Sequence, residues 1–235
     1  MIYYYDKICI NLKVSKDYIK NILPLKELNS HSARCHLDYA SEEAQKFGYQ
    51  SRLEIEQPEM EAFILLKKYE KFMSICEEPK SKYKISYIEI ASDSLCSSKK
   101  ESLIHRDFML EHLRKRYSRE QFVYVSKEPI ISEIKYSDKT LYCGSKKSKS
   151  IMYPRMSKKV DEPCVHFEHR FRGASNIKEK TGISTLDDLI NFDFEQFFTQ
   201  QKEKYIMYEK IDYERLGRWV NNISLRENVI STFGK

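Results

Sequence analysis

Apolar and β-branched residues gather in short segments along the first three quarters of the chain, and polar or glycine-bearing links separate these segments. Several segments alternate apolar with polar positions, which is the period of a strand with one buried face. The pattern predicts strands at residues 2–14, 51–56, 84–91, 121–125, 140–143, 150–156 and 164–172.

Apolar residues at helical spacing mark segments between and after these strands. Pro58 fits the first turn of a helix, where its missing N–H leaves no bond unmade, while Pro24 interrupts the first helical segment. The predicted helices span residues 17–28, 59–75, 102–117, 186–208 and 213–220, whereas residues 30–50 show no clear period.

Strands dominate up to Gly173 and helices dominate after it. This order predicts an α+β fold, with a mostly antiparallel central sheet, helices packed on one face and a helical C-terminal region. We divide the chain into an α+β domain at residues 1–173 and a helical C-terminal extension at residues 174–235, which is a separate unit or part of the same domain.

Amino-acid composition restricts the class of protein and of partner that we expect, but it does not indicate an activity. Lysine plus arginine outnumber aspartate plus glutamate by 41 to 35, and the net charge of +6 suits a polyanionic partner as well as an ordinary solvated surface. The six cysteines form no CxxC pair, so they suggest neither a zinc site nor a disulfide framework. No signal peptide and no apolar stretch of about 20 residues is visible, so we expect a soluble cytoplasmic protein without membrane contact.

Two predicted strands carry charged residues where a buried strand would carry valine. Side chains alternate along a strand, so Glu89 and Asp93 share one face of the first, and His166, Glu168 and Arg170 share one face of the second. Amphipathic strands with one solvated face would explain this pattern. Alternatively, carboxylates from the two strands meet and hold a divalent cation. Oxygen ligands suit Mg²⁺ or Mn²⁺, and an imidazole at position 166 shifts the preference toward Mn²⁺.

A glycine-bearing turn between two strands is followed by a tyrosine and then by a basic residue. The chain reads TLYCGSKKS at residues 140–148 and then Tyr153–Pro154–Arg155. Most of the 17 tyrosines are expected to serve in packing, and the place of Tyr153 after this turn distinguishes it from the others, with Tyr142 as the nearest alternative. On an extended strand Arg155 shares the face of Tyr153.

At this point the chain resembles the replication initiators of filamentous phages and of some rolling-circle plasmids. In that family a pattern like TLY-GS-x-x-S precedes a Y-x-K element that holds the nicking tyrosine, and Arg155 stands in place of the lysine. ISYIEIASD and CVHFEHRF fall where the family has its metal carboxylates, with Tyr87, Glu89 and His166 departing from the family pattern. The resemblance covers roughly residues 50–190.

The resemblance implies a rolling-circle replication initiator, an endonuclease that nicks and rejoins one DNA strand through a metal-assisted phosphotyrosine intermediate. The catalytic residues would be Tyr153 as nucleophile, with Arg155 and Arg170 on the phosphate. The implied ligands for Mg²⁺ or Mn²⁺ are Glu89, Glu168, Asp93 and His166. Origin DNA, single-stranded or in a cruciform, is the expected partner together with a host helicase, and the oligomeric state stays open.

Basic residues interleaved with serine and tyrosine predict contacts to DNA phosphates that do not read sequence. These residues are Lys146, Lys147, Lys149, Lys158, Arg114 and Arg116. Two other functions stay open on the same scaffold. One is a DNA-binding protein without catalysis, and the other is a metal-dependent nuclease that activates water in place of a tyrosine.

Overall fold

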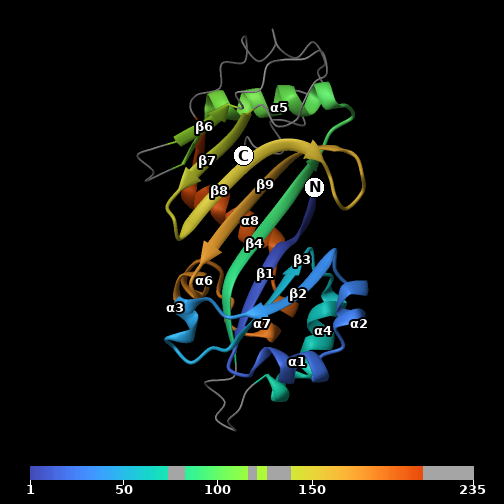
Figure 1. Ribbon diagram of the computed structural model, residues 1–235. Helices are drawn as coiled ribbons and strands as arrows, with labels where there is room; N and C mark the ends of the chain where they lie inside the picture. Colours follow the sequence, from blue (N-terminus) through green and yellow to red (C-terminus); the bar gives the residue numbers. More distant parts are fainter. Residues whose placement is uncertain (74–82, 116–120, 126–138, 209–235) are drawn as a thin grey trace.

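An antiparallel sheet of eight strands forms the centre of the protein in a computed structural model that describes residues 1–73, 83–115, 121–125 and 139–208 (Figure 1). The strand order is β2-β3-β1-β4-β9-β8-β7-β6, and a second sheet pairs β10 with β5. The strands are β1 (Ile2–Leu12), β2 (Arg34–Tyr39), β3 (Ser51–Glu56), β4 (Tyr83–Leu95), β5 (Leu113–Lys115), β6 (Gln121–Val125), β7 (Lys139–Gly144), β8 (Ser148–Met156), β9 (Pro163–Arg172) and β10 (Ile206–Tyr208).

Helices lie beside and behind this sheet. Figure 1 shows α8 behind β4 and β9, and α1, α2 and α4 together at the lower end of the sheet. The helices are α1 (Lys16–Ile22), α2 (Leu25–Ser30), α3 (Glu42–Gln45), α4 (Met60–Lys68), α5 (Lys99–His112), α6 (Ala174–Thr181), α7 (Leu186–Ile190) and α8 (Phe194–Tyr205), with a 3-10 turn η1 (Glu70–Phe72) after α4.

The hydrophobic core lies between one face of the sheet and the helices α1, α2, α4, α6, α7 and α8. Ile8 of β1 pairs with Ile88 of β4, and both are fully buried with Phe63 of α4, Ile177 of α6 and Leu189 of α7. Burying each such side chain contributes about 1.5–3 kcal/mol. The helices after β9 therefore share one core with the strands that precede them.

The two faces of β9 have opposite surroundings. His169 lies on the core side, where it is buried, contacts the Ser150 hydroxyl at 2.9 Å and packs against Phe197 of α8. His166 and Glu168 alternate with it and point to the other side of the sheet. That second side carries the polar side chains of the central strands.

The predicted α+β fold with its antiparallel sheet is confirmed, and all seven predicted strands are present. β4 continues beyond the predicted end to Leu95. β2, by contrast, is not predicted from the sequence. It lies at the edge of the sheet, pairs only with β3 and buries only Leu37, so no alternation of apolar residues marks it.

The first helical segment breaks at Pro24 into α1 and α2, as predicted. The prediction for residues 102–117 is wrong at both ends, because α5 spans Lys99–His112 and β5 follows directly. The sequence also gives no signal for α6, which lies between Gly173 and Gly182, both of which have a positive φ that suits glycine.

The single helix predicted at residues 186–208 is also wrong, since α7 and α8 are separate and residues 206–208 form β10. α7 begins with a capping box between Thr185 and Asp188. Asp193 then caps α8 by accepting a hydrogen bond from the backbone N–H of Gln196 at 2.9 Å. The helix predicted at residues 213–220 lies outside the described residues.

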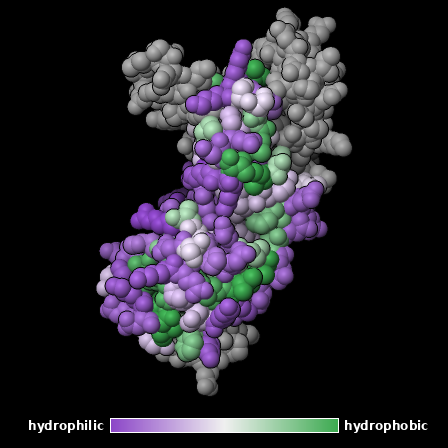
Figure 2. Space-filling model, turned by 90° about the vertical axis from the view of Figure 1, so that its right-hand side faces the viewer, coloured by the Kyte–Doolittle hydropathy of each residue, from purple (hydrophilic) through white to green (hydrophobic). Residues whose placement is uncertain are grey.

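Hydrophilic residues cover most of the described surface visible in Figure 2, with hydrophobic residues in small patches between them. Among the described residues, none of the helices has the length and apolar character needed to cross a membrane.

Candidate functional site

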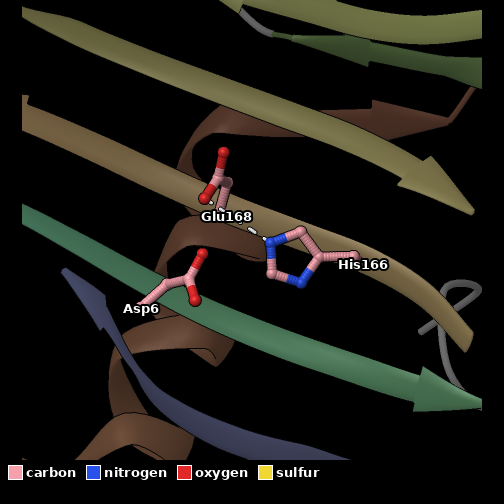
Figure 3. A group of neighbouring side chains, drawn as sticks. All are labelled: Asp6, His166 and Glu168. Atoms are coloured by element: carbon pink, nitrogen blue, oxygen red, sulfur yellow. Dashed lines mark hydrogen bonds and ion pairs between the residues drawn. The ribbon is translucent and has the colours of Figure 1, made fainter. Parts of the chain in front are cut away.

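Three buried side chains from two strands meet on the polar side of the sheet (Figure 3). Asp6 comes from β1, and His166 and Glu168 come from β9. One ligand atom from each lies within 4.8 Å of the other two. Two carboxylates and an imidazole at this spacing form a donor set that fits Mg²⁺ or Mn²⁺. We refer to these three residues as the acidic cluster.

A β-bulge brings Asp6 into the cluster. Tyr5 pairs with Ile90 of β4 and Lys7 pairs with Glu89, so Asp6 is an extra residue that breaks the alternation of β1. The alternation of residues along the sequence does not single out Asp6 as a ligand. An aspartate that interrupts the apolar run YYYDKICI is a signal of a special position. Strict alternation, however, could not show to which face of the sheet its side chain points.

Gln57 holds Asp6 in place from the end of β3. Its side-chain amide donates to the Asp6 carboxylate at 2.9 Å, and its backbone N–H donates to the Asp6 carbonyl at 2.8 Å. Gln57 is buried and has a φ of 49°, a left-handed conformation that is strained for glutamine. Such strain costs about 1–3 kcal/mol and persists only where the surroundings enforce it.

Asp93 of β4 lies behind His166 and fixes its orientation. The His166 Nδ1 and Asp93 Oδ1 atoms are 2.7 Å apart, which directs Nε2 toward Glu168 Oε2 at 3.5 Å. Asp93 also accepts hydrogen bonds from Ser157 at 2.6 Å and Tyr4 at 3.1 Å. Asp93, predicted as a metal ligand, therefore contacts the cluster through His166.

The surroundings of Asp93 and His166 favour the ionised form of both side chains. Burial alone would lower the pKa of His166, but the hydrogen bonds with Asp93 and Glu168 outweigh it and raise that pKa. Burial alone would raise the pKa of Asp93, but hydrogen bonds from His166 and Ser157 lower it. Both shifts favour the charged pair when no cation is bound.

Glu89 and Glu168 lie on the same face of the sheet and share one guanidinium group. Arg170 Nε lies 2.8 Å from Glu168 Oε1 and 3.1 Å from Glu89 Oε1. Tyr87 also donates a hydrogen bond to Glu89. Burial raises the pKa of Glu89, and the negative charge of Glu168 adds to this effect. Arg170 therefore neutralises two acids, and Glu89 lies just outside the acidic cluster.

Tyr153 of β8 is half-buried beside the cluster. Its ring centroid is 5.0 Å from that of His166, with which it pairs across β8 and β9. Arg155 Nη1 lies 3.4 Å from the Tyr153 hydroxyl, so the two side chains share a face. Burial raises the pKa of Tyr153 to about 12, Glu168 contributes in the same direction, and Arg155 opposes it.

Arg155 connects the tyrosine to the rest of the site. It donates a hydrogen bond to the Tyr4 hydroxyl and lies 3.8 Å from the Asp93 carboxylate. Tyr142, the alternative nucleophile, lies in β7 opposite Ile151, and its side chain is outside the described residues.

The predicted phosphate-binding residues lie at different distances from the cluster. Lys158 is exposed and its Nζ is 3.8 Å from Asp6 Oδ1. Lys146 and Lys147 are exposed in the β7–β8 turn, about 20 Å from Tyr153 along an extended strand. Lys149 of β8 pairs with Arg170 of β9. The backbone of Arg114 lies in β5, while Arg116 is outside the described residues.

Comparison with known proteins gives one similar solved structure. It is described as the structure of a rolling circle replication initiator protein from Geobacillus stearothermophilus, with a TM-score of 0.52 and 10% sequence identity. The match covers 98% of this chain and 96% of that one. At this identity the likeness shows a shared fold. No family model matches the chain, and neither does any curated protein.

Proposed function

We propose that this protein is a rolling-circle replication initiator that nicks and rejoins one DNA strand through Tyr153. One observation carries the proposal: the Tyr153 ring packs against His166, a member of the acidic cluster, while its hydroxyl lies 3.4 Å from Arg155. A candidate nucleophile, a basic side chain that can bind phosphate and a donor set for a divalent cation are therefore adjacent. The shared fold with a rolling circle replication initiator supports this assignment.

The proposed reaction is a transesterification in two steps. The phenolic oxygen of Tyr153 loses its proton and bonds to the scissile phosphorus, the P–O3′ bond breaks, and the 3′ oxygen takes up a proton. The 5′ side of the break remains attached as a phosphotyrosine ester. In rejoining, the 3′ hydroxyl loses its proton and attacks that phosphorus, the P–O3′ bond forms again, the bond between phosphorus and the tyrosine oxygen breaks, and that oxygen takes up a proton. The phosphodiester energy is conserved throughout.

The residues of the site divide this work. Arg155 favours the phenolate of Tyr153 and can bind the phosphate oxygens on which charge develops. Asp93 fixes the ring of His166 so that Nε2 is directed into the cluster. A divalent cation held by Asp6, His166 and Glu168 would polarise the phosphate and offset the negative charge that raises the pKa of Tyr153.

A direct test uses the full chain, Mn²⁺ and a pool of random-sequence single-stranded oligonucleotides. The proposal requires a protein–DNA adduct that survives SDS electrophoresis, with the nucleotide mapped to Tyr153 by peptide mass spectrometry. Cleaved DNA without an adduct would instead indicate a nuclease that activates water. Salt-sensitive binding without cleavage in either Mn²⁺ or Mg²⁺ would indicate a DNA-binding protein without catalysis.

Cation affinity is expected to rise with pH. The pKa of His166 is raised above its ordinary value near 6.5, so a proton competes for Nε2 at neutral pH when the cation is absent. Deprotonation removes this competition, and the affinity should increase by up to about tenfold per pH unit until the raised pKa is passed. Titrations of Mn²⁺ between pH 6 and 9 by electron paramagnetic resonance measure this. An affinity independent of pH would remove His166 from the ligand set.

Replacing Gln57 by asparagine should lower Mn²⁺ affinity about tenfold, a typical effect for a group that orients a metal ligand. Asparagine accepts the left-handed backbone, but its shorter side chain cannot make the bond to Asp6. Asp161→Asn is the matched control, because Asp161 also has a positive φ, 53°, and is exposed. Equal affinities in both variants would show that Gln57 does not position Asp6 for a cation.

A further inference from the structure

A small apolar pocket lies beside the acidic cluster at the edge of the sheet. β3 pairs with β1 only over Lys7–Leu12, so residues 2–5 of β1 pair with β4 alone. A cavity of about 270 Å³ occupies the space next to residues 2–5. The start of α4, the loop after β8 and Phe194 complete its walls.

Aromatic side chains form much of this pocket, and apolar side chains give access to it from the surface. Tyr5 packs edge-on against Phe63 at 5.4 Å between ring centroids and lies 4.8 Å from Phe194. Met60 and Val160 also line the pocket, with 37% and 44% of their surfaces exposed. The pocket is therefore an apolar hollow with a buried aromatic floor and an exposed rim.

Tyr4 and Lys159 connect this pocket to the proposed nicking site. Tyr4 lines the pocket, and its hydroxyl is hydrogen bonded to both Asp93 and Arg155. Lys159 lines the pocket too, with its ammonium group 5.4 Å from the centroid of the Tyr4 ring. A phosphate bound between Arg155 and Tyr153 would thus lie one side chain away from the pocket.

We propose that this pocket binds a nucleobase of single-stranded DNA next to the phosphate that Tyr153 attacks, an inference that rests on the proposed function. Bases stack on aromatic side chains with little regard to sequence, and this stacking holds a single strand in a defined register. Lys159 supplies the positive charge that the neighbouring phosphate requires. Seating one base in the pocket would fix which phosphodiester bond faces the tyrosine.

The test compares Met60→Glu with Ile64→Glu. Both residues are exposed on α4 and both variants introduce the same charge, but only Met60 lines the pocket. Oligo-dT with single 5-iododeoxyuridine substitutions is the probe, and photo-crosslinks are mapped by mass spectrometry on the full chain. Met60→Glu should weaken binding about tenfold and remove crosslinks to the peptides around residues 2–5 and 58–63, whereas Ile64→Glu should change affinity less than about twofold.

Equal losses in the two variants, or crosslinks confined to β8 and β9, would overturn the pocket assignment. The adduct assay on the unaltered protein separates this inference from the proposed function. An adduct at Tyr153 together with equal behaviour of the two variants rejects only the pocket. Failure of the unaltered protein to form an adduct, with Met60-dependent crosslinks retained, rejects the nicking and leaves base binding in place.

Discussion

Tyr153→Phe is expected to reduce covalent adduct formation by more than about 1,000-fold, because the substitution removes only the oxygen that we propose attacks the phosphate. The ring can still pack against His166, and among the described residues the hydrogen bond lost is the 3.4 Å contact with Arg155. Folding and affinity for single-stranded DNA should therefore change little. Gel quantification of the adduct, circular dichroism and a DNA-binding titration measure the three properties.

Tyr39→Phe provides the control, since Tyr39 lies in β2 with 63% of its surface exposed and does not contact the cluster. This variant should form the adduct at the normal rate. If Tyr153→Phe still forms the adduct, a different tyrosine is the nucleophile, and Tyr142→Phe is the next variant to examine.

Glu168→Gln is expected to lower Mn²⁺ affinity about 100-fold and adduct formation with it. Glu168 is fully buried and contacts both His166 and Arg170. Water therefore cannot readily compensate for the loss of its negative charge. A cation present at 100 times its Kd stabilises the unaltered protein by about 2.7 kcal/mol, and at the same concentration this gain should fall to about 0.4 kcal/mol in the variant. Thermal unfolding with and without Mn²⁺ measures it.

Without a cation, the Glu168→Gln substitution should lower the free energy of unfolding by less than the roughly 2.7 kcal/mol that the bound cation contributes. The negative charge of Glu168 raises the pKa of Glu89, and its removal relieves that repulsion while Arg170 keeps Glu89 as a partner. Glu54→Gln serves as control, because Glu54 lies in β3 and pairs with Lys7 outside the cluster. Stabilisation by Mn²⁺ that persists in Glu168→Gln would place the cation elsewhere.

Most of what the sequence predicts about the site follows from the alternation of side chains along each strand. Because side chains alternate strictly in an uninterrupted strand, the sequence assigns Glu89 to the polar face of β4, and Glu168 and Arg170 to the polar face of β9, while the meeting of these two faces was one of two alternatives. The structure places all three in contact through the guanidinium group of Arg170. The same reasoning put Arg155 beside Tyr153.

Asp6 could not be placed in this way, because the bulge after Tyr5 adds a residue to β1 and removes the alternation on which the assignment depends. The role of Asp93 is equally hidden in the sequence. Its face is predictable, but only the packed structure shows that the ring of His166 lies between Asp93 and Glu168.

The chain order of the sheet has a consequence for when the acidic cluster can form during synthesis. The acidic cluster joins a residue from the first strand to two from β9, and the strand order requires β4 to lie between them. Contacts so distant in sequence form late and slowly during folding. A nascent chain that has emerged only as far as β8 lacks His166 and Glu168, and it also lacks the strand that joins β8 to β4. The cluster and its neighbour Tyr153 can therefore come together only after β9 has been synthesised, so any activity of the proposed nicking site would begin no earlier.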